Sequence, residues 1–181
     1  MTCIIGYQDK DRVIMGADTQ GTDEYGTVQY KTDSKIFKKN GVLFGIAESH
    51  RTNQVVRYKF NIPERDINIS LMEYMCTSFI DELMNVLGLN NCTLFKDNRS
   101  CSVEMIVGIE NKLFGIDEDF HIIQQELPFY AIGSGKRFAL GSLLTLEDDF
   151  TLRPKERIER ALAVSAKLCS TVGNAPFDFI E

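Results

Sequence analysis

The stretch MTCIIGYQDKDRVIMGA, residues 1–17, decides the fold of this chain. It contains two short apolar runs, residues 2–7 and 12–17, on either side of the charged segment QDKD. Such a pattern predicts a β-hairpin with a tight polar turn. Thr2 and Cys3, whose side chains can both act as nucleophiles, stand directly before the first apolar run. The hairpin therefore raises the question of whether the start of the chain is only a buried strand or also a reactive group.

Working outward, strands and helices alternate in blocks. A second hairpin, residues 34–47, is predicted around the Asn40-Gly41 turn, which is a strong local hairpin signal. Helices are predicted over 48–60 and 70–89, strands over 102–109, 112–116, 120–125 and 129–133, helices over 133–146 and 154–170, and a short tail over 177–181. Two antiparallel sheets with helix pairs between the strand blocks suit an α+β fold, a four-layer αββα sandwich, in one domain over residues 1–181.

Composition narrows the function classes. The chain of 181 residues is 44% apolar and 25% charged, as in ordinary globular proteins, and its formal charge of −6 disfavours nucleic-acid binding. It contains no apolar run near the ~20 residues that cross a bilayer, and no secretory signal, so no membrane role is expected. Its five cysteines form no CxxC pair, and its histidines are His50 and His121. We therefore expect no metal, no cofactor and a reducing, cytoplasmic location.

Several segments, in the same order along the chain, resemble the proteasome-type N-terminal-nucleophile hydrolases. They are MTCIIG (1–6), GADTQGT (16–22), SKI (34–36), YAIGSG (130–135) and ERALAVSAKLC (159–169). The pattern is most similar to that of the bacterial proteasome-like HslV peptidases. The resemblance covers nearly the whole chain, and its strength lies in the order of the segments rather than in any single one.

The resemblance implies a set of catalytic residues. Thr2 would be the nucleophile, exposed by removal of Met1, and its free α-amino group, with an ordinary pKa of about 7.7–8.0, would be the base. Lys35 would be a buried ammonium that lowers the pKa of the Thr2 hydroxyl, and Asp18 would pair with Lys35 and hold it. Ser134 would form a hydrogen bond near the Thr2 amine and help to move the proton. Each of these residues taken singly fits a turn, a strand end or a helix entry; together they favour the nucleophile interpretation.

The substrate side departs from the family pattern. Relatives commonly have AGG where this chain has GIAES (45–49), and one glycine N–H there forms the oxyanion hole. Glu48 stands at that place; its backbone N–H can still donate, but its carboxylate would have to point away from a developing oxyanion. Ile46 would fall near the first specificity pocket, which implies an apolar preference.

The C-terminal part departs as well. The family commonly carries an Asp that supports the threonine amine, followed three residues later by Ser-Gly. Depending on the alignment, Lys167 or Cys169 falls where that Asp would stand, and Ser170 and Thr171 are alternative hydroxyl donors.

The resulting prediction is a threonine peptidase subunit that cleaves peptide bonds. The resemblance implies a homo-oligomeric ring that acts on peptides or unfolded proteins. It also allows an ATPase unfoldase as a partner. Two alternatives stay open: a catalytically silent scaffold or binding subunit, favoured by Glu48 and the missing Asp, and a small-molecule amidase of the same class. Cys3 competes with Thr2 for the nucleophile role, but alternation along the strand places it on the opposite face, in the core.

Overall fold

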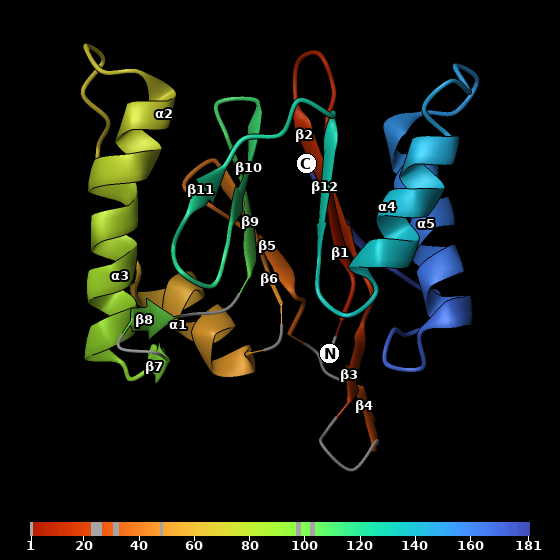
Figure 1. The fold of residues 1–181 in the computed structure, drawn as a ribbon, viewed down its shortest axis with the longest axis horizontal. Helices are drawn as coiled ribbons and strands as arrows, with labels where there is room; N and C mark the ends of the chain where they lie inside the picture. The colour runs from red at the N-terminus through yellow and green to blue at the C-terminus, as the bar shows by residue number, and fades with distance from the viewer. Residues whose placement is uncertain (1, 23–26, 31–32, 48, 97–98, 102–103) are drawn as a thin grey trace.

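The computed structural model describes residues 2–22, 27–30, 33–47, 49–96, 99–101 and 104–181. Two antiparallel sheets form its centre (Figure 1). The first sheet has the order β12 (Phe129–Ile132), β1 (Ile4–Gln8), β2 (Val13–Ala17) and β13 (Asp178–Ile180). The second has the order β11 (Ile122–Ile123), β10 (Lys112–Ile116), β9 (Met105–Ile109), β6 (Val42–Ile46) and β5 (Ile36–Lys39).

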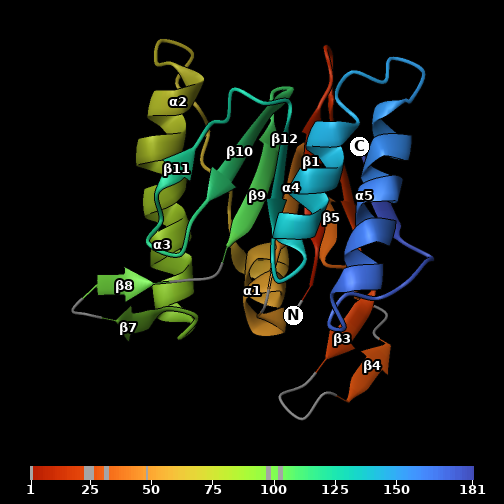
Figure 2. The ribbon, with the colours of Figure 1, turned by 45° about the vertical axis from the view of Figure 1, so that its right-hand side comes forward.

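Helices cover the outer face of each sheet. On the side of the second sheet lie α1 (His50–Lys59), α2 (Leu71–Tyr74), the π-helical turn η1 (Met75–Phe79) and α3 (Ile80–Leu89). On the side of the first sheet lie α4 (Lys136–Thr145) and α5 (Pro154–Leu168), and the turned view in Figure 2 shows the same layers. The predicted α+β class with antiparallel sheets and helices is confirmed.

Three apolar clusters fill the spaces between these layers. Ile4, Met15, Ile36 and Ile106 belong to the cluster that the inner faces of the two sheets share. The other two clusters join each sheet to its own helices. Removing this apolar surface from water is the main driving force that holds the layers together.

The local turn signals are confirmed. The β1–β2 hairpin pairs Gln8 with Val13, and the β5–β6 hairpin pairs Lys39 with Val42. Asn40 and Gly41 both have positive φ angles, of 48° and 81°, as a tight two-residue turn between twisted strands requires.

Two expectations differ from the structure. The strand expected over 120–125 is limited to β11, because Phe120 adopts a positive φ of 66° in a turn before it. The segment expected to be a tail, residues 177–181, instead contains β13, which pairs with β2 and completes the first sheet.

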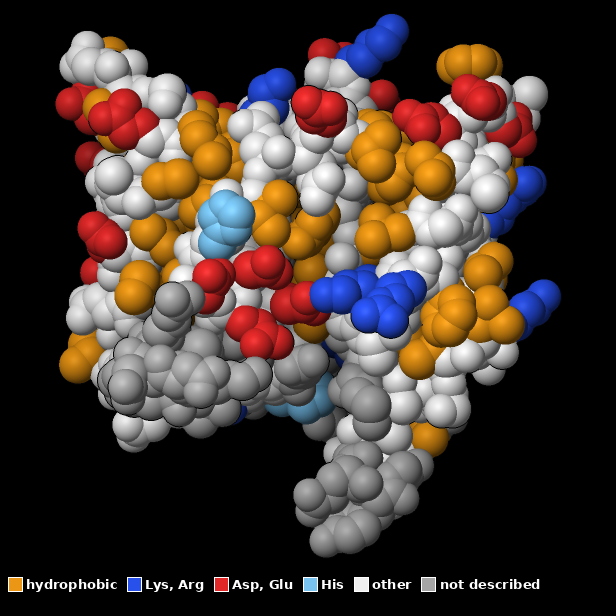
Figure 3. All heavy atoms as spheres, in the orientation of Figure 1, with side chains coloured by type: hydrophobic (Ala, Val, Ile, Leu, Met, Phe, Trp, Pro, Cys, Tyr) orange, Lys and Arg blue, Asp and Glu red, His pale blue; other side chains and the backbone are white. Residues whose placement is uncertain are grey.

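Two short hairpins extend from the body, β3 (Gln20–Thr22) with β4 (Val28–Tyr30), and β7 (Leu94–Lys96) with β8 (Arg99–Cys101). Within the described ranges, no helix is both long and apolar enough to cross a bilayer. Acidic and basic side chains lie next to one another near the middle of the face shown in Figure 3.

Candidate active site

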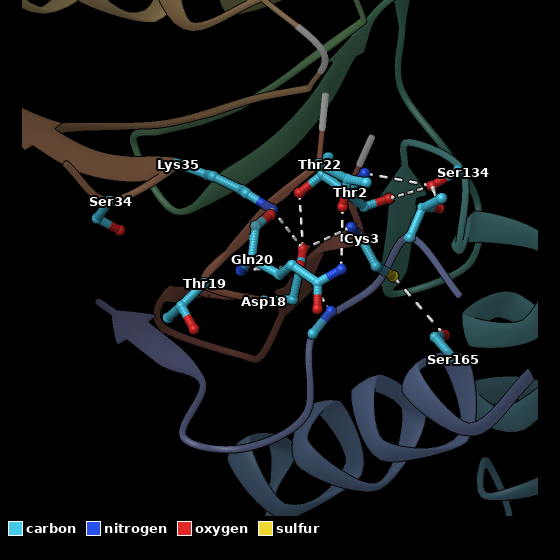
Figure 4. Close-up of polar contacts among 12 residues, drawn as sticks. Thr2, Cys3, Asp18, Thr19, Gln20, Thr22, Ser34, Lys35, Ser134 and Ser165 are labelled. Carbon is cyan, nitrogen blue, oxygen red and sulfur yellow. Dashed lines mark hydrogen bonds and ion pairs between the residues drawn. The ribbon is translucent and has the colours of Figure 1, made fainter. Parts of the chain in front are cut away.

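Thr2 lies at the start of β1, almost completely buried, with 1% of its surface exposed. Its hydroxyl Oγ1 donates a hydrogen bond to Asp18 Oδ1 at 2.7 Å (Figure 4). The hairpin explains this contact, because the register pairs Ile4 with Ala17 and the ladder continues outward with Asp18 N donating to Cys3 O at 3.1 Å. The residues that precede β1 and follow β2 are therefore held side by side.

The Asp18 carboxylate is the centre of the site and has no exposed surface. Its oxygen Oδ1 accepts from Thr2 Oγ1 at 2.7 Å, Cys3 N at 2.8 Å and Lys35 Nζ at 2.8 Å. Its oxygen Oδ2 accepts from Gln20 N at 3.2 Å and Gly173 N at 2.9 Å. A buried carboxylate needs this kind of compensation, because an unpaired charge in the interior is very costly.

Lys35 comes directly before β5 and brings its ammonium into the interior. Only 7% of the residue is exposed, and Nζ donates to Asp18 Oδ1 and, at 2.6 Å, to Gln20 O. Burial lowers the pKa of Lys35 below its ordinary value, and the neighbouring Asp18 carboxylate opposes that shift. The structure thus places a buried cation and the Thr2 hydroxyl on the same carboxylate oxygen.

Ser134 lies between β12 and α4, on the other side of Thr2. The Thr2 nitrogen donates to Ser134 Oγ at 3.2 Å, and Ser134 Oγ donates to Thr2 O at 3.2 Å. Gly133 makes this approach feasible: its φ is +86°, and a Cβ there would lie 2.4 Å from Thr2 O. The four residues predicted as catalytic, Thr2, Asp18, Lys35 and Ser134, are therefore joined by hydrogen bonds.

The remaining predicted residues are placed differently. Cys3 is fully buried in the cluster under α4 and α5, where burial raises the pKa of its thiol to about 12. A thiol that stays protonated at neutral pH is a poor nucleophile, which leaves Thr2 as the candidate. Ile46 is 3% exposed and packs in the cluster between the second sheet and α1 and α3. Glu48 lies outside the described residues, so its role in the oxyanion hole stays a prediction.

The structure distinguishes between the C-terminal residues that were candidates for a place near the Thr2 amine. Lys167 is exposed, whereas Thr171 Oγ1 lies 2.9 Å from Ser134 Oγ. The turn that carries Thr171 follows α5, and Gly173 of the same turn donates to Asp18. Sequence reasoning missed Gly173, because a backbone donor supplied from 155 positions away leaves no local signal.

Glu104 is a further residue that sequence reasoning missed. It is 8% exposed, and Oε2 accepts from Gly133 N at 3.1 Å, while Oε1 forms an ion pair with Lys136. Its backbone oxygen accepts from Ala47 N at 3.1 Å. Glu104 therefore connects the loop that carries Ser134 to the end of β6.

The described residues also line a cavity away from this site. A cavity of about 530 Å³ is lined by the turn residues Arg12, Asn40 and Asn111, so it lies at the ends of the strands opposite Thr2. Among the residues that the structure describes, no group of three or more His, Cys, Asp or Glu side chains is placed to hold a metal ion.

Comparison with solved structures identifies the fold. BPH of Thiobacillus denitrificans, in complex with epoxomicin, matches with a TM-score of 0.82 at 17% identity over 99% of this chain and 97% of its own. Eukaryotic HslV from Trypanosoma brucei matches with a TM-score of 0.71 at 20% identity, covering 99% and 98% of the two chains. Anbu from Pseudomonas aeruginosa, described as a helical assembly, matches with a TM-score of 0.66 at 15% identity, covering 99% and 80%.

Sequence comparison is less informative than the structure. No model of a known protein family matches the chain, and no curated protein matches it in sequence. The structural matches nevertheless extend over almost the entire chain. The fold is that of the proteasome-type N-terminal-nucleophile hydrolases, as the resemblance predicted.

Proposed function

We propose that this chain is a threonine peptidase subunit whose nucleophile is Thr2, made N-terminal by removal of Met1. One observation carries the proposal: Thr2 Oγ1 and Lys35 Nζ share Asp18 Oδ1, while the Thr2 nitrogen contacts Ser134 Oγ. The hydroxyl that would attack and the amine that would take its proton belong to one residue, and each has a fixed polar partner.

The steps follow from these contacts. Thr2 Oγ attacks the peptide carbonyl carbon, and its proton passes to the free Thr2 amine, which acts as the general base. The tetrahedral intermediate collapses as the amine of the substrate leaves with that proton, and an ester to Thr2 remains. Water then attacks the ester with the Thr2 amine again as base, releasing the acid and the free hydroxyl. The Lys35 ammonium stabilises negative charge that develops on Thr2 Oγ during attack.

The surrounding fold supports the same assignment. The four-layer αββα architecture brings β1, β2, β5 and the β12–α4 loop together at one point, which is where these four side chains meet. The structural neighbour in complex with epoxomicin supports testing this chain with an epoxyketone. For the oxyanion hole we propose the backbone N–H of Glu48, which lies outside the described residues.

We further propose that the subunit assembles with copies of itself in the cytoplasm, in a closed ring, and acts on peptides or unfolded chains, with an ATPase unfoldase as a candidate partner. A helical assembly of Anbu supports self-association in proteins of this fold. Symmetric closure is the usual outcome when identical subunits associate.

The test is the intact mass of the protein with and without a peptide epoxyketone, which reacts with a hydroxyl and a neighbouring free amine together. We expect loss of Met1 and one adduct on Thr2, abolished by Thr2→Ala and by Lys35→Ala. Thr145→Ala is the matched control, because Thr145 Oγ1 is bonded only locally to Ser142 O in the described structure. Retained Met1 and no adduct would favour a scaffold subunit, and turnover of small amides without peptides would favour an amidase.

A further inference from the structure

Two polar contacts connect the sheets at the end of the sandwich where Thr2 lies. Lys35, directly before β5 of the second sheet, reaches Asp18, directly after β2 of the first. Glu104, directly before β9 of the second sheet, reaches the turn that follows β12 of the first. Because β1 lies between β2 and β12, Thr2 at its start lies between these two contacts. The reaction steps proposed above involve the Lys35 contact and give no part to Glu104.

The Glu104 carboxylate holds the turn of residues 133–136 at both of its ends. Its oxygen Oε2 accepts from Gly133 N at 3.1 Å, and its oxygen Oε1 forms the ion pair with Lys136. The turn is also closed on itself, because Lys136 N donates to Gly133 O at 3.1 Å. Glu104 and Gly133 are both buried, so water does not readily replace the hydrogen bond between them.

The two middle residues of this turn are in contact with Thr2. Ser134 Oγ accepts from Thr2 N and donates to Thr2 O, each at 3.2 Å, and Gly135 N also donates to Thr2 O at 3.2 Å. The position of the Ser134 hydroxyl relative to the Thr2 nitrogen therefore depends on how firmly the ends of the turn are held. A displacement of about 1 Å in a reacting group is enough to cost about a hundredfold in rate.

The backbone of Glu104 is fixed by the opposite wall of the site. The pairing of β6 with β9 continues beyond these strands, with Ala47 N donating to Glu104 O at 3.1 Å. The next residue along the chain is Glu48, whose N–H we propose as the oxyanion donor. Glu104 thus connects the turn that carries Ser134 to the strand end that leads to this donor.

We propose that Glu104 is a positioning residue for the chemistry at Thr2: its side chain fixes the turn that carries Ser134, and its backbone fixes that turn relative to the end of β6. This inference rests on the proposed function. Of the two partners of the carboxylate, Gly133 matters more. Its N–H is buried, whereas the Lys136 side chain is 40% exposed and water can solvate it when the ion pair is lost.

The experiment measures epoxyketone adduct formation on Thr2 by intact mass over a range of inhibitor concentrations, which separates the maximal rate from the half-saturating concentration. Glu104→Ala should lower the maximal rate about tenfold and leave the half-saturating concentration within about twofold, because the turn positions reacting groups rather than the inhibitor. Glu104→Gln, whose carbonyl oxygen can still accept from Gly133 N, should stay within about threefold of the wild-type maximal rate. Lys136→Met, which leaves the Gly133 bond in place, should do the same.

Two comparisons separate positioning from a general loss of stability. Glu110 stands at the other end of β9 and is ion-paired with Arg65, so Glu110→Ala is the matched control. It should leave the maximal rate within about twofold of wild type, whatever stability it costs. In a Ser134→Ala background, Glu104→Ala should lower the rate by less than about threefold, because the hydroxyl that it positions is absent.

Amide hydrogen exchange in the turn of residues 133–136 tests the same contact without activity. Exchange there should be faster in Glu104→Ala than in wild type and unchanged in Glu110→Ala. A wild-type maximal rate in Glu104→Ala, or an equal loss of rate with and without the Ser134 hydroxyl, would overturn the inference and leave the proposed function intact. A wild-type protein that forms no Thr2 adduct would overturn the proposed function itself, and unchanged exchange in Glu104→Ala would then show that Glu104 does not hold the turn either.

Discussion

Replacing Asp18 by Asn tests the centre of the site most directly. The amide keeps the shape of the side chain but removes its charge and turns one acceptor oxygen into a donor. In one orientation the new NH2 group faces Lys35 Nζ and Cys3 N; in the other it faces Gln20 N and Gly173 N. In either orientation the new NH2 group faces other hydrogen-bond donors at a fully buried position, and the Lys35 ammonium loses its carboxylate partner.

The expected cost follows from these contacts. Breaking a buried ion pair by removing one partner costs about 3–5 kcal/mol, a large fraction of the ~5–15 kcal/mol that stabilises a typical native protein. For a chain of this size about 2–4 °C of melting temperature correspond to each kcal/mol, so we expect a fall of about 6–20 °C. Lys35→Met should cost about half as much or less, because the carboxylate keeps its backbone donors Cys3 N and Gly173 N.

Urea unfolding followed by circular dichroism measures all three free energies: Asp18→Asn, Lys35→Met and the double variant. The double variant should be more stable than Asp18→Asn alone, because it removes the uncompensated ammonium. The reasoning is refuted if Asp18→Asn lies within about 1 kcal/mol of wild type, or if Lys35→Met costs as much as Asp18→Asn.

The other predictions concern the surroundings of Thr2. Because burial raises the pKa of Cys3 to about 12 from 9.0, the stability that its neutral thiol contributes is full below pH 9 and is lost as the pH rises toward 12. At pH 11 the free energy of unfolding of wild type should have fallen about 3 kcal/mol further than that of Cys3→Ala; parallel curves would contradict this. Gly133→Ala forces a Cβ against Thr2 O and should slow adduct formation and lower stability by more than about 1 kcal/mol, whereas Gly88→Ala, which meets no atom within 4 Å, should be neutral or stabilising. Glu104→Ala leaves Gly133 N without its acceptor and should cost about 1–3 kcal/mol in urea unfolding; Glu104→Gln, which can still accept, should recover at least half of that cost.

Sequence reasoning succeeds where the cause is local. The Asn40-Gly41 turn requires positive φ angles that these residues tolerate, so the hairpin follows from a few neighbouring residues. The three-residue strand β13 depends instead on pairing with β2 across the whole chain, and no local pattern distinguishes it from a tail. The order of short apolar runs and helices was sufficient to predict the fold class, because only a few layered arrangements cover both faces of two sheets.

The candidate site likewise combines residues that sequence motifs predict with contacts that only the fold determines. Thr2, Asp18, Lys35 and Ser134 could be named from their resemblance to known motifs, yet their hydrogen bonds depend on the register of distant strands. Glu104 acts through the backbone of other residues, at Gly133 N and Ala47 N. Contacts of this kind leave no pattern in the sequence, since any residue supplies the N–H and only the fold decides which acceptor it meets.

The two sides of Thr2 differ in how closely stability and chemistry are connected. Asp18 is buried and holds together the starts and ends of strands, so any change that disturbs the nucleophile there also disturbs the fold. Ser134 is exposed and Thr171 is half-buried. If the hydrogen bond between their hydroxyls is lost, water can form hydrogen bonds with both groups in its place. Thr171→Val should therefore lower the melting temperature by no more than about 2–4 °C in a thermal unfolding scan. A loss of stability as large as that of Asp18→Asn would instead show that the Thr171 contact is part of the packing that holds the fold together.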